Sequence, residues 1–287
     1  MGPFEYLEPL SLEEAVSLLS KYGHRAKILA GGTDLVPSMK ERTVNPEYII
    51  NLGRIPSLDF IRVDKNGLRI GALTTVRSIE QAQELRPKYR LLAQAAGQLA
   101  STSIRNVATI GGNLCNCSPS ADTAPALLAL SAKTQIVGTA GGRVISLEQF
   151  LRGPGTTALK PDELLTEIQI PAPPPSAVGV YIKFSTRGGE DLALVGVAAL
   201  VTLEDGLCTD IKITLGAVAP TAIRAYRAET ILKRTRLSRE LIEQAARIAA
   251  EESKPIDDVR GSAEYRREMI KVLTRDAVMQ AAGLAKP

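Results

Sequence analysis

The sequence has 287 residues, of which 45% are hydrophobic and 23% are charged, and its formal net charge is +4. This balance is ordinary for a globular protein, and the length allows one large domain or two ordinary ones. No apolar run is long enough to span a bilayer, and residues 1–10 lack the basic start and apolar centre of a secretory signal. Basic and acidic residues are interspersed and aromatic residues are few, so we expect a cytoplasmic protein that binds no nucleic acid.

Histidine and cysteine are scarce. The only histidine is His24, expected in a solvated loop, and the cysteines are Cys115, Cys117 and Cys208. An odd number of cysteines argues against a disulfide framework. Three are too few for an iron–sulfur cluster, which takes about four protein ligands. We therefore expect no metal site and no catalytic side chain in this chain, so that any redox chemistry belongs to a bound cofactor.

The first hundred residues alternate short strands with helices. Ser11, with Glu14 three residues later, predicts the capped start of a helix that ends at Gly23. Asn66-Gly67 lies between two alternating apolar stretches and predicts a hairpin. Strands are expected at 4–6, 27–30, 48–52, 59–63 and 68–72, with further helices at 75–85 and 88–100 and a short helical turn near Pro37.

A proline-rich run follows the next group of elements. The helix expected over 123–132 is apolar on nearly every side, which indicates that it lies inside the protein. A hairpin is expected from 134–137 and 143–145, and a strand over 164–170. Residues 171–175 read Pro-Ala-Pro-Pro-Pro, which is typical of a semi-rigid linker. We therefore place a domain boundary there, giving domains of residues 1–175 and 176–287.

The second domain has a different order of elements. Strands are expected at 180–185, 192–203 and 211–218, with a turn at 204–206, followed by helices at 228–233, 239–252 and 263–282. Strands followed by helices indicate an α+β domain with an antiparallel sheet.

Two Gly-Gly pairs follow apolar stretches, in residues 29–35 and 109–113. Both are expected to be turns, because glycine accepts positive φ and leaves backbone N–H groups open to an anion. They predict either two loops that grip one extended phosphate-bearing ligand or two loops that need glycine for geometry alone. Residues 153–158, Gly-Pro-Gly-Thr-Thr-Ala, lack the strand and helix of a dinucleotide fingerprint and are expected to form a surface turn.

Three stretches, in the same order, resemble the FAD-binding medium subunits of the molybdenum hydroxylases, which include the xanthine dehydrogenases and aerobic carbon monoxide dehydrogenase. They are residues 29–35, 106–113 and 118–122, and the resemblance continues through 215–221, Arg224 and 257–261. It implies an α+β protein: a PCMH-type domain of two α/β subdomains with FAD in the cleft between them, then the smaller α+β C-terminal domain.

The resemblance also implies the residues of an FAD site. The first loop would wrap the pyrophosphate with backbone N–H groups, and the second would grip it from the other subdomain. Asp122 would accept a hydroxyl on the adenosine side, and Lys183 would lie beside the isoalloxazine, where a cation favours the reduced anionic flavin. The full set of implied FAD-binding residues is Leu29, Ala30, Gly31, Gly32, Thr33, Asp34, Leu35, Val36, Ala100, Thr109, Ile110, Gly111, Gly112, Asn113, Asp122, Leu165 (near the flavin ring) and Lys183. Valine at position 32 or 111 is expected to abolish FAD binding with little loss of fold.

The family function implied is electron transfer within a larger assembly. Electrons would pass from a large molybdopterin subunit, through two-iron two-sulfur clusters of a small subunit, to FAD in this chain and on to an external acceptor. The assembly implied is a dimer of heterotrimers. Asp34 stands where carbon monoxide dehydrogenase has a serine, which favours a xanthine-dehydrogenase-like relative. A stand-alone flavoprotein oxidase or dehydrogenase, and a scaffold with a vestigial nucleotide site, stay open as alternatives.

Overall fold

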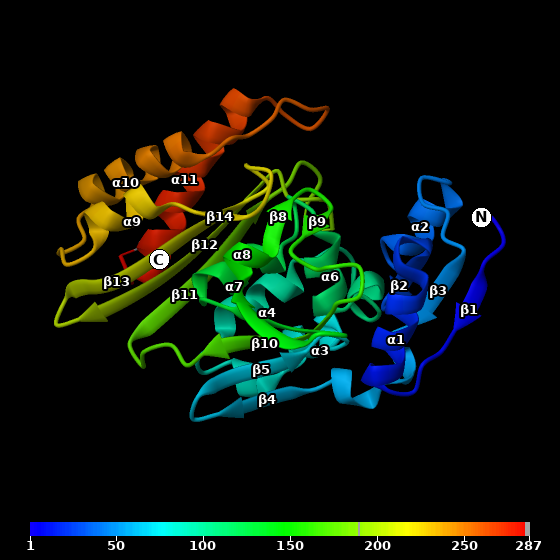
Figure 1. Ribbon diagram of the computed structural model, residues 1–287. Helices are drawn as coiled ribbons and strands as arrows, with labels where there is room; N and C mark the ends of the chain where they lie inside the picture. The colour runs from blue at the N-terminus through cyan, green and yellow to red at the C-terminus, as the bar shows by residue number, and fades with distance from the viewer. Residues whose placement is uncertain (189, 285–287) are drawn as a thin grey trace.

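The computed structural model describes residues 1–188 and 190–284, which form three parts of mixed helix and sheet (Figure 1). We call them the first lobe, the second lobe and the third layer, in chain order. The first lobe is a three-stranded parallel sheet, order β1-β3-β2, with helix α1 packed against it. Ser11 accepts a hydrogen bond from the Glu14 N–H at 3.1 Å, and Gly23 ends the helix at φ +53°, so the expected boundaries of this helix are confirmed. Its elements are β1 (Glu5–Leu7), α1 (Leu12–Tyr22), η1 (Gly23–Arg25), β2 (Ala26–Leu29), α2 (Leu35–Lys40), β3 (Tyr48–Asn51), η2 (Leu52–Arg54) and η3 (Pro56–Leu58).

The second lobe is a five-stranded sheet, order β4-β5-β10-β6-β7, in which every neighbouring pair is antiparallel. The lobe is therefore α+β, where the resemblance implied an α/β subdomain. Every residue of α7 is buried, as its apolar sequence predicts. The elements are β4 (Ile61–Asp64), β5 (Gly67–Gly71), α3 (Val76–Gln81), η4 (Gln83–Leu85), α4 (Arg90–Gly97), α5 (Thr102–Arg105), α6 (Ile110–Asn116), α7 (Thr123–Ala129), β6 (Lys133–Gly138), β7 (Gly141–Ser146), α8 (Leu147–Phe150), β8 (Leu151–Gly153), β9 (Thr156–Thr157) and β10 (Leu164–Pro171).

The third layer is a four-stranded antiparallel sheet, order β11-β12-β13-β14, with three helices on one face. In Figure 1 these helices lie on the side of the sheet away from α4 and α7. The α+β arrangement expected here is confirmed; residues 285–287 lie outside the described part. The elements are β11 (Ala177–Phe184), β12 (Val195–Glu204), β13 (Leu207–Gly216), β14 (Ile223–Arg224), α9 (Tyr226–Leu232), α10 (Arg239–Glu252) and α11 (Ala263–Ala281).

Strand β12 shows how closely the third layer is joined to the second lobe. Its side chains alternate between two cores, as the period of a strand requires. Val197 and Ala199 pack with α9–α11, while Ala198 and Leu200 pack in the core of the second lobe. The hydrophobic core therefore continues past the proline run, and the boundary at residue 175 stays a prediction. No helix among the described residues is long and apolar enough to cross a membrane.

Candidate cofactor-binding cleft

A cleft of about 740 Å³ is lined by both lobes. Strand β2 and the loop after it contribute from the first lobe, and the start of α6 and the start of β10 contribute from the second. Leu192, from the segment between β11 and β12, completes the wall. The volume lies within the range of about 300–1,000 Å³ that is typical of ligand sites.

The first Gly-Gly pair forms the turn that the sequence predicts. Gly32 has φ +71°, and the Val36 N–H donates to the Gly32 carbonyl at 3.0 Å, which closes the turn at the start of α2. Within the described part of the chain, no hydrogen bond uses the backbone N–H groups of residues 31–34. Residues 31–34 line the cleft, and open backbone donors of this kind are suited to an anion such as a pyrophosphate.

Gly31 brings the two lobes into contact. A Cβ atom on Gly31 would lie 2.0 Å from the carbonyl oxygen of Val107 and 2.9 Å from the Cα of Ala108. Only glycine allows the backbones of the first loop and of the chain before α6 to approach this closely. Glycine is therefore needed here to keep the lobes together, in addition to leaving room for a ligand.

The second Gly-Gly pair is not a turn, and this expectation is wrong. Gly111 and Gly112 lie in the first turn of α6, and Thr109 caps this helix. The backbone N–H groups expected to grip a phosphate are already used inside the protein: Ile110 donates to Thr74 O at 3.0 Å, Gly111 to Ala72 O at 2.9 Å, Gly112 to Thr109 Oγ1 at 3.1 Å and Asn113 to Thr109 O at 3.0 Å.

In the second Gly-Gly segment, residues 109–113, side chains are the donors available to a ligand in place of these backbone N–H groups. The Thr123 hydroxyl donates to Asn113 Oδ1 at 2.6 Å, so the amide nitrogen of Asn113 is the group left for a ligand. Asn113 lines the cleft together with Thr109, whose hydroxyl proton is also able to donate. The second segment can therefore bind a phosphate-bearing ligand through side chains.

The position of Gly111 corrects a second expectation. A Cβ on Gly111 would lie 2.6 Å from the carbonyl oxygen of Ala72 and 2.7 Å from its Cβ. Gly111→Val would thus force packed backbone segments apart. The expectation that this variant loses little of its fold is therefore wrong. At Gly32 the nearest atom is the Leu29 Cδ1 at 3.0 Å, which is able to move, although the positive φ still disfavours a side chain.

Asp122 and Lys183 form a buried ion pair. Lys183 Nζ lies 3.0 Å from Asp122 Oδ2 and donates to the Gln98 carbonyl at 2.8 Å, and Tyr181 donates its hydroxyl proton to Asp122 Oδ1 at 2.8 Å. The side chains of Lys183 and Asp122 are only 2% and 6% exposed. Burial raises the pKa of Asp122 above its ordinary value, and Lys183 opposes this shift. Burial and the neighbouring carboxylate raise the pKa of Tyr181 well above its ordinary value.

This pair changes the roles expected for its members. The resemblance placed Asp122 on the adenosine side of FAD and Lys183 beside the isoalloxazine, two ends of an extended molecule. Because their charged atoms lie 3.0 Å apart, the two assignments do not hold together. Asp122 lines the cleft, whereas Lys183 is outside the lining and is joined to it through its ion pair with Asp122. Tyr181 was missed, since a tyrosine on a strand gives no signal in sequence.

Ala100 and Leu165 both line the cleft, as expected. Ala100 has φ +43°, a conformation rare for residues other than glycine. Buried Arg105 holds it, donating to the carbonyls of Ala100 at 2.7 Å and Leu99 at 3.0 Å. Arg105 in turn pairs with Glu80 at 2.9 Å. The strained turn is therefore fixed by a buried guanidinium that lies five residues after Ala100.

Most of the residues expected at the site do line the cleft. They are Ala30, Gly31, Gly32, Thr33, Asp34, Leu35, Ala100, Thr109, Gly111, Gly112, Asn113, Asp122 and Leu165, whereas Leu29, Val36, Ile110 and Lys183 lie outside the lining. Sequence reasoning missed Lys27, Cys115, Ser118, Ser120 and Lys160, which line the cleft as well. Ser118 and Ser120 belong to a stretch that carried the resemblance, which is the one signal that could have found them. Burial raises the pKa of Cys115 to about 12, so its thiol is neutral and unsuited to attack a ligand.

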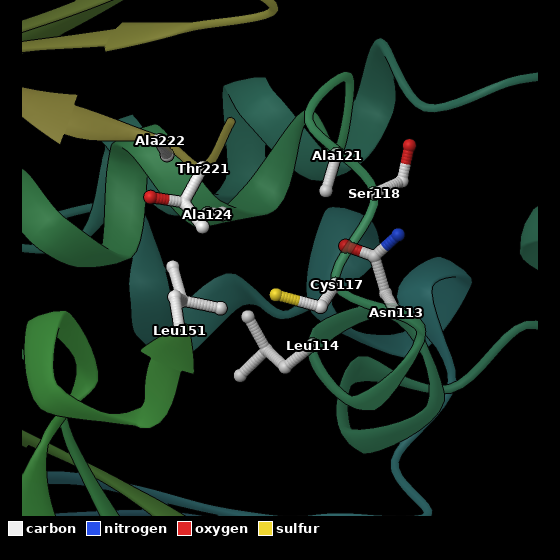
Figure 2. A pocket seen from close by; sticks show the side chains of 9 residues that line it. All are labelled: Asn113, Leu114, Cys117, Ser118, Ala121, Ala124, Leu151, Thr221 and Ala222. Carbon is white, nitrogen blue, oxygen red and sulfur yellow. The ribbon is translucent and has the colours of Figure 1, made fainter. Parts of the chain in front are cut away.

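A second, small cavity is lined by residues of α6, α7 and β8, among them Leu114, Ala124 and Leu151 (Figure 2). Its volume is about 10 Å³, and the Cys117 sulfur points into the space beside Leu114 and Leu151. This is room for one water molecule at most. The small cavity is therefore a packing feature, and the large cleft is the candidate ligand site.

The fold and the cleft define a protein that binds a phosphate-bearing organic cofactor. Comparison with known proteins identifies the family. Residues 2–173 match the family described as FAD binding domain in molybdopterin dehydrogenase, and residues 180–281 match the CO dehydrogenase flavoprotein C-terminal domain. The chain belongs to the FAD-binding medium subunits of the molybdenum hydroxylases, and as such it is an FAD-binding oxidoreductase subunit.

Individual relatives agree over nearly the whole length. The chain is 35% identical over 285 residues to the carbon monoxide dehydrogenase medium chain of Afipia carboxidovorans, covering 99% of both. It is 31% identical over 282 residues to the xanthine dehydrogenase FAD-binding subunit of Escherichia coli O157:H7, covering 98% of this chain and 96% of the relative. A carbon monoxide dehydrogenase structure from Hydrogenophaga pseudoflava matches with a TM-score of 0.96 at 34% identity, covering 99% of both chains.

Proposed function

We propose that this chain is the electron-transfer subunit of a heteromeric molybdenum hydroxylase. It would receive electrons from iron–sulfur clusters of a small partner subunit, supplied in turn by a large molybdopterin subunit, and pass them to an external acceptor. One observation carries this proposal: a chain with a large cleft suited to a cofactor matches a medium chain over 99% of both lengths. The remaining redox groups would then belong to other chains.

The residues of the cleft divide the work of holding FAD. The N–H groups of residues 31–34 would donate to the pyrophosphate, and the amide of Asn113 and hydroxyl of Thr109 would donate from the other lobe. The buried pair of Asp122 and Lys183 would fix the wall of the cleft where β11 meets α7. Bound FAD would supply the redox chemistry, which no side chain of this site provides.

The identity of the organic substrate would be set by the large subunit. The two relatives above are similar to this chain, but one is named for carbon monoxide dehydrogenase and the other for xanthine dehydrogenase. The dimer of heterotrimers, the external acceptor and the cytoplasmic location are predictions of the same proposal.

The test starts with the chain expressed alone and titrated with FAD, followed by co-expression with its partner subunits. The isolated chain should bind FAD without covalent linkage, and substrate should reduce its flavin only in the assembled complex. A chain that binds no FAD would refute the proposal. Substrate-dependent loss of flavin colour in the isolated chain would favour a stand-alone flavoprotein instead.

A further inference from the structure

The loop between α10 and α11 carries two exposed apolar side chains. In Figure 1 this orange segment projects beyond the end of its two helices. Ile256 is 67% exposed and Val259 is fully exposed. A single exposed apolar residue is normal, but two on one projecting loop indicate a contact surface. We call residues 254–261 the projecting loop.

The projecting loop is held in one conformation by its acidic residues. Asp257 Oδ1 accepts from the Ala263 N–H at 2.7 Å, and Asp258 Oδ1 accepts from the Arg260 N–H at 2.8 Å. Asp258 and Gly261 exchange backbone hydrogen bonds of 3.2 Å. Because the loop is already ordered, a partner that binds it has little conformational entropy to remove.

A buried arginine ties the projecting loop to the segments that carry Leu194 and Ala217. Arg266 pairs with Asp258 at 2.8 Å and donates to the carbonyls of Leu194 at 2.9 Å and Ala217 at 3.2 Å. Leu194 follows the segment in which half-exposed Leu192 lines the cleft. Partly exposed Ile104 lines the same cleft. The base of the projecting loop therefore lies near Leu194, two residues after Leu192 in the wall of the cleft.

We propose that the projecting loop is the docking contact for the iron–sulfur subunit, with Ile256 and Val259 as its apolar anchors. This inference rests on the proposed function. An electron donor has to bind close to the cleft, because electron transfer slows steeply with distance. The connection through Arg266 and Leu194 joins the base of the loop to the segment that contributes Leu192 to the cleft wall. A rigid loop with apolar side chains at its tip suits insertion into a pocket of that partner.

The test uses the complex purified through a tag on this chain. The double variant Ile256→Glu/Val259→Glu should retain FAD and its melting temperature but lose at least tenfold in iron bound per flavin. The milder Ile256→Ser/Val259→Ser removes the same contacts without adding charge and should lower the iron per flavin as well. The matched control is Val144→Glu/Val178→Glu, because these valines are 45% and 49% exposed on β7 and β11 and should tolerate the change.

Each outcome bears on the inference. Wild-type iron per flavin in the double glutamate variant would overturn it, as would an equal loss in the control. Loss of molybdenum with iron retained would assign the loop to the large subunit instead. A change only in the self-association of the isolated chain would assign it to a second copy of this chain. A wild-type chain that binds FAD but never co-purifies with iron would overturn the proposed function itself.

Discussion

Replacing Gly31 by alanine should separate the two loops that form the cleft. The added Cβ would lie 2.0 Å from the Val107 carbonyl oxygen, whereas ordinary contacts begin at 3.4 Å, so the backbones have to move apart by about 1.4 Å. The opposing atom is backbone and is unable to rotate away. We expect overpacking of this kind to lower the free energy of unfolding by about 1–3 kcal/mol.

The same movement should weaken FAD binding. A hydrogen bond to a charged group contributes about 1.5–3 kcal/mol, so losing one pyrophosphate contact lowers the affinity about tenfold to a hundredfold. Calorimetric titration of the apoprotein with FAD measures this change, and differential scanning calorimetry measures the loss of stability. Gly153→Ala is the matched control, because nothing lies within 4 Å of the position its Cβ would occupy.

The result that would refute this reasoning is specific. If Gly31→Ala bound FAD within twofold of the wild type and melted at the same temperature, the contact between the loops would be dispensable. An equal loss in Gly153→Ala would show that the effect comes from the alanine substitution in general, independent of the contact with Val107.

Three further predictions concern the same cleft. The pKa of Asp34 is raised above its ordinary value of 3.8, chiefly because the cleft wall desolvates it, and a bound pyrophosphate disfavours its charged form further. FAD affinity should therefore rise as pH falls from about 7 toward 4, and Asp34→Asn should flatten this dependence in titrations across that range. Lys183→Ala leaves Asp122 buried without its cation and should destabilise the chain by about 3–5 kcal/mol in urea unfolding, while Asp122→Asn in the same chain should restore part of the loss. Gly111→Val should give aggregated or unfolded chain, and recovery of soluble, FAD-free protein with a wild-type melting temperature would contradict the close contact with Ala72.

The sequence predicts the elements well where the signal is local. The Ser11 cap, the Asn66-Gly67 hairpin and the apolar helix α7 depend on neighbouring residues, and all three are present. The first Gly-Gly turn is predicted for the same reason, since a turn after a strand needs a residue of positive φ.

The second Gly-Gly segment shows where local reasoning fails. Glycine is less favourable than alanine in a helix interior by about 1 kcal/mol, so two glycines in a row indicate a turn. The structure overrides this preference because Gly111 has to pack against Ala72. In addition, the hydroxyl of Thr109 accepts a hydrogen bond from the Gly112 N–H. The pairing of Asp122 with Lys183 spans 61 residues, and nothing near either residue signals it.

That long-range pair bears on how the protein is made. Asp122 belongs to the second lobe, but the lysine and tyrosine that stabilise its charge lie on β11, beyond the proline run. Chains emerge from the ribosome amino-terminus first, so both glycine segments are available well before β11 is synthesised. We therefore expect the cleft to mature late, and a chain that stops at the proline run to hold FAD poorly although it contains both loops. The part of the chain after the proline run would then complete the cofactor site. The two family regions, residues 2–173 and 180–281, would therefore not work as independent modules.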